Sequence, residues 1–342
     1  MNKWYEKSGE MGDVIVSTRI RLARNLKKYP FPYKLNINEK KDINKIVTGV
    51  LVGGNSVLSN RFKVIDLDKL NEINLVSLVE RHLVSPNFIS NKDSGRLLLL
   101  DDETVSIMLN EEDHIRIQVM KEGLDLDGTY DLADKIDLLL GENLSYAFNS
   151  KLGYLTQCPT NLGTGMRASI MLHLPALQRN GYIDRISSSL SKLGLTLRGS
   201  YGEGTQAIGA LYQISNQVTL GLSEKDAINN LKNVVLQLVE QERSARKLLS
   251  KDIKVLDKIS RSLGILLYSK ILSNEEFMNL ISNVRLGISI GEIKDITYDV
   301  INPLVIDVQP ATLMKNEEKE MLPSKRDELR ANIVRKRLAE NK

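Results

Sequence analysis

The feature that most constrains the fold is a series of short segments, between about residues 14 and 220, in which apolar and polar residues alternate. Glycine, proline and asparagine separate these segments, and a period of two is typical of β-strands with one covered face. A helical pattern between two of the segments, at residues 183–193, predicts a helix that covers the sheet. The segments expected to form strands are 14–22, 106–109, 115–119, 168–174 and 195–198.

The pattern changes from sheet to helix after about residue 221. Ser223 with Asp226 three residues later is a helix-capping pair, and the apolar spacing that follows predicts a long helix to about Leu249. Residues 317–340 are expected to form a strongly charged helix that is interrupted at Pro323. The predicted fold class is therefore α+β, with a smaller all-helical C-terminal domain.

We expect the boundary between these domains near residue 246, which gives domains of 1–246 and 247–342.

The 342 residues are 42% hydrophobic and carry a net charge of +4, so the composition is that of a globular protein without a general need for nucleic acid. The single cysteine, Cys158, excludes an intramolecular disulfide and suits a cytoplasmic location. No apolar run approaches the roughly 18 residues of a membrane span. No structural metal site is expected, because the three histidines lie far apart.

Two arginines follow each other at alternate positions in the segment Ser-Thr-Arg-Ile-Arg at residues 17–21. In a strand, Arg19 and Arg21 project from one face while Ile20 projects from the other. Neighbouring guanidinium groups repel each other unless an anion lies between them. Taken alone, the segment also fits an exposed basic strand.

A second segment reads Asn-Glu-Glu-Asp-His at residues 110–114 and leads into an expected strand. Alternation is expected to place Glu112, His114, Arg116 and Gln118 on one face. A carboxylate and a guanidinium then point into the same space. The alternative is an acidic hairpin turn.

Two glycine-containing loops carry further charged residues. The loop at residues 158–165 leads Arg167 onto the polar face of the next strand, and the loop at 198–204 carries Arg198 and Glu203. Neither loop ends in the Gly-Lys-Ser/Thr of a P-loop, so that mode of nucleotide binding is excluded.

Together these segments predict phosphoryl transfer. Their arginines offer planar forks of donors that match the oxygens of a triphosphate, and transfer depends mostly on positioning and charge neutralisation. Glu112 and Glu203 suit a cationic planar acceptor, a guanidinium, whose pKa above about 12 makes it a poor nucleophile until a proton is removed. A Cys158 thiolate is able to hold a non-reacting nitrogen, although a lone cysteine is more often a small buried apolar residue. The phosphate-binding candidates are Arg19, Arg21, Arg116, Arg167 and Arg198.

At these positions the chain resembles the phosphagen (guanidino) kinase family, which includes arginine and creatine kinases. The matching segments occur in the family's order and cover roughly residues 10 to 250. They are Ser-Thr-Arg-Ile-Arg at 17–21, Asn-Glu-Glu-Asp-His at 110–114, Cys-Pro-Thr-Asn-Leu-Gly-Thr at 158–164, Arg-Ala-Ser at 167–169 and Arg-Gly-x-x-Gly-Glu at 198–203.

The resemblance implies a mostly antiparallel sheet flanked by helices, with ATP bound by the five arginines. It implies that Glu112 and Glu203 are catalytic, that Cys158 contacts the guanidinium and that His82 contacts the nucleotide. Mg²⁺ is expected to accompany ATP without protein ligands of its own. The remaining nucleotide-binding residues implied are Ser17, Thr18, Ile20, Ala168, Ser169, Ile170, Met171, Gly199, Ser200, Tyr201 and Gly202.

Two departures resemble the bacterial branch of the family that phosphorylates arginines in proteins. The first motif already begins at Ser17, so we expect this chain to lack the helical domain that precedes it in small-molecule members, and a helical region is expected after the catalytic segments instead. Residues 326–331 are also similar to that branch's allosteric phosphoarginine-binding motif. Arg326 and Arg330, one helical turn apart, are expected to hold the phosphate, with Asp327 on the ligand's guanidinium and Ala331 beside them. A solvated helix with routine Asp327–Arg330 pairing is the alternative.

The predicted function is therefore transfer of the γ-phosphoryl group of ATP to arginines in protein substrates. A small-molecule guanidino kinase and a non-catalytic phosphoarginine reader are the alternatives, and nucleic-acid binding by the basic residues 330–337 rests on charge alone. By resemblance, the implied partners are an activating adaptor, a Clp chaperone-protease that degrades the marked proteins, and further copies of this chain.

Overall fold

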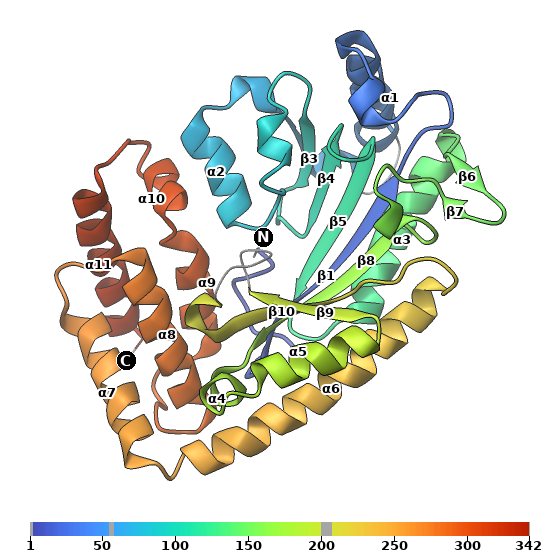
Figure 1. The fold of residues 1–342 in the computed structure, drawn as a ribbon. Coiled ribbons are helices and arrows are strands. Elements are labelled where there is room, and N and C mark those ends of the chain that lie inside the picture. The colour runs from blue at the N-terminus through green and yellow to red at the C-terminus, as the bar shows by residue number, and fades with distance from the viewer. Residues whose placement is uncertain (1–2, 55–57, 200–206, 342) are drawn as a thin grey trace.

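The computed structural model describes residues 3–54, 58–199 and 207–341, and within them eight strands form one sheet (Figure 1). The strand order is β2-β3-β4-β5-β1-β8-β10-β9, and every neighbouring pair is antiparallel. The predicted fold class is thus confirmed. The strands are β1 (Ile15–Arg24), β2 (Phe62–Asp66), β3 (Arg96–Leu100), β4 (Val105–Leu109), β5 (Ile115–Glu122), β8 (Met166–His173), β9 (Leu195–Gly199) and β10 (Leu211–Asn216), with a separate hairpin of β6 (Phe148–Asn149) and β7 (Gly153–Tyr154).

Strand β1 lies in the middle of the sheet, between β5 and β8. Its alternation has the predicted effect, because Ile20 and Leu22 are buried in the main core while Arg19 and Arg21 project from the opposite face. In the register of the sheet, Arg21 pairs with Arg167 of β8. Arginines from sequence-distant strands are therefore neighbours on one face.

Helices cover the two faces of the sheet unequally. Helices α1 (Ile37–Val52), α3 (Leu126–Asn143) and α6 (Glu224–Leu249) contribute to the main core on the face that holds Ile20. On the opposite face, α2 (Glu72–Glu80) packs through a smaller core onto β3 and β4. That face stays available for polar side chains over β5, β1 and β8. Two short helices, α4 (Pro175–Arg179) and α5 (Ile183–Lys192), follow β8.

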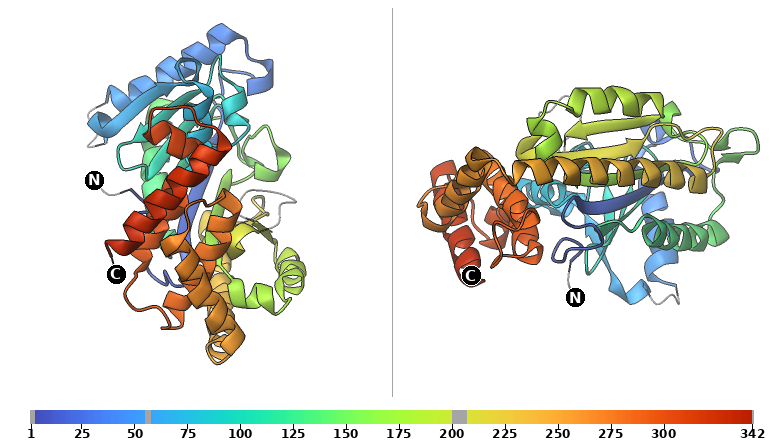
Figure 2. Two further views of the ribbon diagram at one scale, coloured as in Figure 1. Left: turned by 90° about the vertical axis from the view of Figure 1, so that its left-hand side faces the viewer. Right: turned by 90° about the horizontal axis from the view of Figure 1, so that it is seen from below.

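The C-terminal helices form a bundle beside one end of the sheet (Figures 1 and 2). Helix α6 begins as predicted, with the Ser223 Oγ accepting a hydrogen bond from the Asp226 amide at 3.1 Å. The boundary expected at residue 246 falls in the last turn of this helix. The bundle consists of α7 (Ile253–Tyr268), α8 (Asn274–Ser289), α9 (Tyr298–Asp307), α10 (Pro310–Asn316) and α11 (Pro323–Ala339). None of the described helices is both long enough and apolar enough to cross a membrane.

The predicted start of the last helix, at residue 317, was wrong. Residues 317–322 connect α10 to α11 instead of opening a helix that continues to Glu340. Helix α11 starts at Pro323. Proline has no N–H group, but the N–H groups of a helix's first turn have no partner within the helix, so proline is well tolerated there.

A buried ion pair joins the bundle to the sheet. Glu242 in α6 accepts hydrogen bonds from the amides of Ala176 and Leu177, and it pairs with Arg246 at 2.7 Å. Arg246 also donates to the carbonyl of His173, at the end of β8, and to the Ser289 hydroxyl of α8, both at 2.7 Å. Hydrogen bonds to the two residues of this ion pair therefore connect α6 with the start of α4, the end of β8 and α8.

Candidate active site

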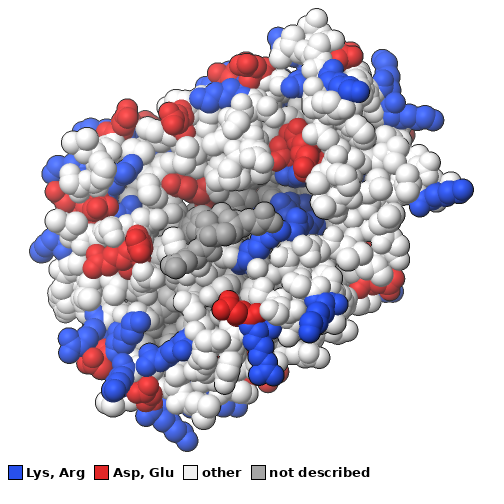
Figure 3. All heavy atoms as spheres, viewed as in Figure 1, with Lys and Arg blue, Asp and Glu red and all other residues white. Residues whose placement is uncertain are grey.

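Four arginines from the three central strands project from the same face of the sheet. Arg19 and Arg21 come from β1, Arg116 from β5 and Arg167 from β8. They line adjoining cavities together with Arg198 of β9, and Arg167 forms part of the wall of three of them. Figure 3 shows Lys and Arg side chains gathered in a hollow on this face. The structure thus brings together all five arginines predicted from the sequence.

Burial and mutual repulsion make this cluster electrostatically unfavourable. Burial, together with the charges of Arg167 and Arg116, lowers the pKa of Arg19 to about 10. The pKa of Arg21 falls well below its ordinary value for the same reasons, with Arg19 as its strongest like-charged neighbour. Among the described residues, the buried Arg21 Nε also has no hydrogen-bond partner. An anion with several negative charges relieves this repulsion, so the residues present fit a triphosphate.

Neutral side chains accept hydrogen bonds from two of these arginines. Arg19 donates from Nη2 to the Gln213 Oε1 at 2.6 Å and from Nε to the Ser169 hydroxyl at 3.3 Å, and Arg167 donates to the Ser215 hydroxyl at 3.3 Å. Gln213 and Ser215 belong to β10, which the sequence analysis missed. The signal was present, because polar Gln213 and Ser215 alternate with buried Tyr212 and Ile214.

A rigid turn between β4 and β5 delivers the acidic residues. Asn110 adopts a positive φ of 61°, and its amide donates to the Asn44 Oδ1 at 2.9 Å. The buried Asp113 accepts from the Asn25 side chain at 2.6 Å and from the Gln157 amide at 2.8 Å. Asn110 and Asp113 thus fix the turn. The acidic hairpin turn, which the sequence analysis gave as the alternative to a charged site, is therefore part of that site.

His114 does not share the face of Glu112, which corrects the prediction from alternation. Its Nδ1 accepts from the Leu26 amide at 2.9 Å and its Nε2 donates to the Pro30 carbonyl at 2.8 Å, so the buried ring faces away from the cavities. Burial lowers the pKa of His114. The prediction failed because β5 begins at Ile115, and a period of two does not hold in the turn before it.

Two adjacent glutamates bracket Arg116 in different ways. Glu111 pairs with its Nη1 at 2.5 Å and Glu112 with its Nη2 at 2.9 Å. The Glu111 side chain is 4% exposed and accepts from the Ser85 hydroxyl, whereas the Glu112 side chain is 37% exposed. Glu111, which the sequence analysis did not select, therefore fixes the arginine. Glu112 keeps carboxylate surface for a second cation.

Cys158 lines the same cavity as Glu112 and Arg21. It is partly buried, and its Sγ lies 3.0 Å from the Thr160 hydroxyl. The loop continues to Gly163, which has a φ of 111° and where an added Cβ would lie 2.2 Å from the Thr219 carbonyl oxygen. Only glycine permits this approach, which holds the cysteine loop against the segment after β10.

His82 lies at the edge of the arginine cluster, in a turn with a positive φ of 59°. The Gln118 side chain donates to the His82 carbonyl at 2.8 Å and so supports this turn from β5. Burial and the nearby Arg19 lower the pKa of His82 to about 4. The ring is therefore neutral at physiological pH.

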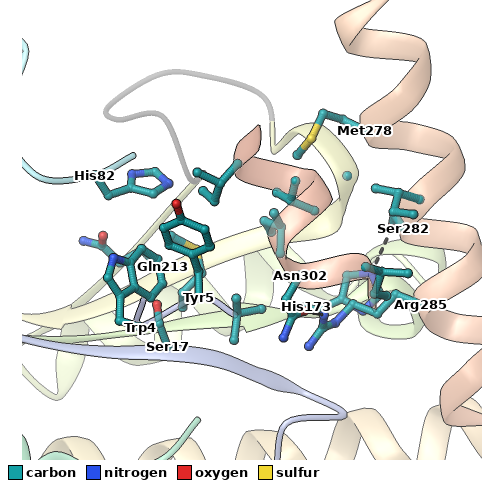
Figure 4. A pocket seen from close by; sticks show the side chains of 18 of the residues that line it. Trp4, Tyr5, Ser17, His82, His173, Gln213, Met278, Ser282, Arg285 and Asn302 are labelled. Atoms are coloured by element: carbon teal, nitrogen blue, oxygen red, sulfur yellow. Dashed lines mark hydrogen bonds between the residues drawn. The ribbon is translucent and has the colours of Figure 1, made fainter. Parts of the chain in front are cut away.

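A second, mostly apolar cavity adjoins the arginines and reaches the helical bundle (Figure 4). Arg19, His82 and Gln213 lie on the walls of both spaces. The far end is formed by α8 and α9, and Trp4 and Tyr5 of the N-terminal segment form one side. Sequence patterns gave no signal for this cavity, because its walls come from segments that are far apart in the chain.

The remaining residues implied by resemblance fall into three groups. Ser17, Ser169 and Met171 line the apolar cavity, and Gly199 lines the cavity of the arginines. Thr18, whose hydroxyl donates to the Gly123 carbonyl at 2.7 Å, is buried, as are Ile20, Ala168 and Ile170 in the main core on the opposite face. Ser200, Tyr201, Gly202 and Glu203 lie outside the described residues.

The C-terminal motif differs from the expectation that both of its arginines face one ligand. Arg330 is 1% exposed, and it donates to the carbonyls of Val308 and Leu272 at 2.9 and 2.7 Å and to Asp327 at 2.6 Å. The i,i+3 pairing considered as the alternative is therefore present. Arg326 is partly exposed, and Ala331 is fully buried. Arg330 turns inward because backbone carbonyls in the bundle require donors.

The fold and the site define a phosphotransferase whose acceptor is a guanidino group. A family model described as the C-terminal catalytic domain of ATP:guanido phosphotransferases matches residues 42–245, and one described as the protein-arginine kinase McsB C-terminal domain matches 252–342. The protein-arginine kinase of Clostridium acetobutylicum is 48% identical over 340 residues, covering 99% of this chain and 100% of that protein. That of Halothermothrix orenii is 45% identical and covers 99% and 97%. The chain belongs to the ATP:guanido phosphotransferase family and, within it, to the protein-arginine kinases.

Solved structures agree with this assignment. Lombricine kinase superposes with a TM-score of 0.60 at 26% identity, covering 69% of this chain and 68% of that chain. A substrate-free duplicated taurocyamine kinase from Schistosoma mansoni gives 0.59 at 28% identity, covering 69% of this chain and 36% of that chain.

Proposed function

We propose that this protein transfers the γ-phosphoryl group of Mg-ATP to the guanidinium groups of arginines in other proteins. The observation that carries the proposal is the cluster of half-buried arginines beside a partly exposed carboxylate, Glu112, in one set of adjoining cavities. The cluster fits a polyphosphate and the carboxylate fits a cationic acceptor. The two meet at Arg116, which contacts Glu112 directly.

The nucleotide fits the two neighbouring spaces in one orientation. Its phosphates suit the arginine cluster, and its base suits the apolar cavity that Arg19, His82 and Gln213 connect to that cluster. Mg²⁺, when bound with the nucleotide, neutralises part of the phosphate charge. The arginines hold the triphosphate in place and stabilise the charge that develops as the bond between the γ-phosphorus and the leaving oxygen breaks.

The acceptor requires alignment and loss of a proton. A guanidinium is cationic over the physiological range, so a carboxylate has to take a proton from the attacking nitrogen as the N–P bond forms. We assign this role to Glu112, with Glu203 as its partner. To Cys158, which lines the same cavity as Glu112, we assign the contact with a nitrogen that does not react.

A protein-borne arginine is preferred to free arginine because the sequence relatives over nearly the whole chain are named protein-arginine kinases. The test is incubation of the protein and Mg-ATP with either an unfolded model protein or free arginine. Phosphate on arginine is then detected at neutral pH, since the N–P bond is acid-labile. Phosphate on the model protein is the expected result. Phosphate on free arginine alone would make this a small-molecule guanidino kinase, and absence of transfer would favour a phosphoarginine reader.

The variant Glu112→Gln tests the role of the carboxylate, because it keeps the shape of the side chain and removes its basicity. We expect transfer to fall about 100-fold or more, the usual contribution of general acid–base catalysis. Glu317→Gln, in the exposed connection after α10, is expected to leave the rate unchanged. A Glu112→Gln variant with the wild-type rate would exclude the carboxylate from the reaction.

We further propose a cytoplasmic location, an activating adaptor, and a Clp chaperone-protease that takes up the phosphorylated proteins. Self-association is supported by exposed apolar side chains on and beside α7, namely Ile253, Ile265, Tyr268 and Ile271. Phosphoarginine binding by the C-terminal motif would use Arg326 with Asp327, while Arg330 holds Asp327 in place. Titration with free phosphoarginine, comparing the Arg326→Ala variant with wild type, tests this binding.

A further inference from the structure

One carboxylate of the catalytic domain bonds directly to the helical bundle. Glu80, the last residue of α2, accepts from the amide of Ala311 at 2.9 Å and from the amide of Thr312 at 2.7 Å. It also accepts from the Thr312 hydroxyl at 2.8 Å. Ser77, one turn earlier in α2, lies 3.3 Å from the same hydroxyl. Hydrogen bonds to a charged acceptor are about twice as strong as neutral ones, so this contact is firm and directional.

Glu80 stands two residues before His82, at the end of α2. The turn at His82 is fixed on its other sides as well. Arg81 forms a buried ion pair with Glu103, and the Gln118 side chain donates to the His82 carbonyl. The positive φ of His82 leaves the turn little freedom to relax. The same turn carries the His82 ring, which borders the arginine cluster and the apolar cavity.

The bundle holds its side of the contact equally well. The segment before Ala311 receives a hydrogen bond from Arg330 of α11 at the Val308 carbonyl, 2.9 Å, and one from the Asn274 side chain of α8 at Gln309, 3.2 Å. Thr312 itself is 2% exposed. Glu80 thus connects a turn beside the proposed nucleotide site to a segment of the bundle that α8 and α11 also hold.

We propose that Glu80 is a positioning residue through which the helical bundle sets the affinity for ATP, by holding His82 against the nucleotide. The inference rests on the proposed function, because it assumes that ATP occupies the cavities beside His82. It assigns to the bundle a role at the nucleotide site that requires no residue of α10 to touch the ligand. Glu80 acts on KM for ATP and leaves the chemistry at Glu112 unaffected.

The first test compares Glu80→Gln with Glu72→Gln, the same change at an exposed position of the same helix. In Glu80→Gln one of the two acceptor oxygens becomes an amino group that faces N–H donors. We expect KM for Mg-ATP to rise about 5- to 10-fold with kcat within about twofold, because part of a charged hydrogen-bond set is lost. The Glu72→Gln variant should match wild type in both constants.

Thr312→Val is the milder variant and serves if Glu80→Gln does not fold. It removes the hydroxyl donor and leaves both backbone donors in place, so we expect KM for Mg-ATP to rise about two- to threefold. Titration calorimetry with Mg-ATP should give the same order of affinities without the phosphotransfer assay. Unchanged nucleotide affinity in both variants overturns the inference.

A double-mutant cycle shows whether Glu80 acts through His82. If it does, Glu80→Gln combined with His82→Ala raises KM no further than His82→Ala alone. Fully additive effects, or a fall in kcat with KM unchanged, contradict the inference. Wild-type protein that neither binds Mg-ATP nor transfers phosphate overturns the proposed function itself. Wild-type transfer with unaltered KM in the Glu80 variant overturns this inference alone.

Discussion

Arg19 and Arg21 of the catalytic cavity differ from Arg246 and Arg330, in and beside the helical bundle, in what surrounds their guanidinium groups. In the cavity, burial and neighbouring arginines lower the pKa values of Arg19 and Arg21, and Arg19 donates to the neutral Gln213 and Ser169. In and beside the bundle, Arg246 pairs with the buried Glu242, and Arg330 donates to two carbonyls and Asp327. An arginine whose donors the protein satisfies supports structure. An arginine surrounded by other cations is held ready for an anionic ligand.

The most direct test of this difference is to make the same chemical change, arginine to methionine, in both regions. In the cavity, Arg21→Met keeps most of the side-chain length and removes the charge. We expect phosphotransfer to fall about 100- to 1000-fold, as when one preorganised donor to a transition state is lost. The free energy of unfolding should stay equal or rise, because a cation among cations is removed. Rate assays and urea unfolding measure the two quantities.

Arg246→Met is the matching change in the junction and should have the reverse effect. It leaves Glu242, which is fully buried, without its ion-pair partner. We expect a loss of about 3–5 kcal/mol in the free energy of unfolding. A variant as stable as wild type would show that the two groups of arginines do not differ as described.

We expect a smaller loss of phosphotransfer when the buried one of the two adjacent glutamates is changed. Glu111 holds Arg116 from a buried position, whereas Glu112 is partly exposed towards the cavity. Glu111→Gln should therefore lower transfer about tenfold by loosening Arg116, well short of the effect of Glu112→Gln. Equal losses in the two variants, measured as kcat/KM, would remove the distinction between them.

The smallest expected effect is a dependence of stability on pH. The pKa of His82 is about 4 in the folded protein, below its ordinary value of 6.5, so the unfolded chain binds a proton that the folded protein does not. Stability should therefore fall by about 1–3 kcal/mol as the pH drops from 6.5 to 4, relative to a His82→Gln variant. Parallel curves for the two proteins, from unfolding measured along this range, would contradict the shift.

Much of the site was predictable because its residues obey local rules. The alternation at residues 15–24 places Arg19 and Arg21 opposite Ile20 in any strand, whatever its neighbours. The same rule failed at His114, because a turn of five residues stands before β5 and a turn has no period of two. The sequence analysis did not apply the rule to Gln213, although buried and less buried residues alternate at the start of β10.

The sequence by itself determined that the chain builds a sheet with helices after it, and that basic and acidic side chains share polar faces. Hydrophobic periodicity is a local property, so those faces could be assigned before the strands were paired. Only the tertiary structure decided that Arg167 pairs with Arg21, that Arg246 and Arg330 are satisfied, and that Glu80 bonds to α10. The reason is physical: an arginine's electrostatic state depends on groups within a few ångströms, and those come from distant parts of the chain.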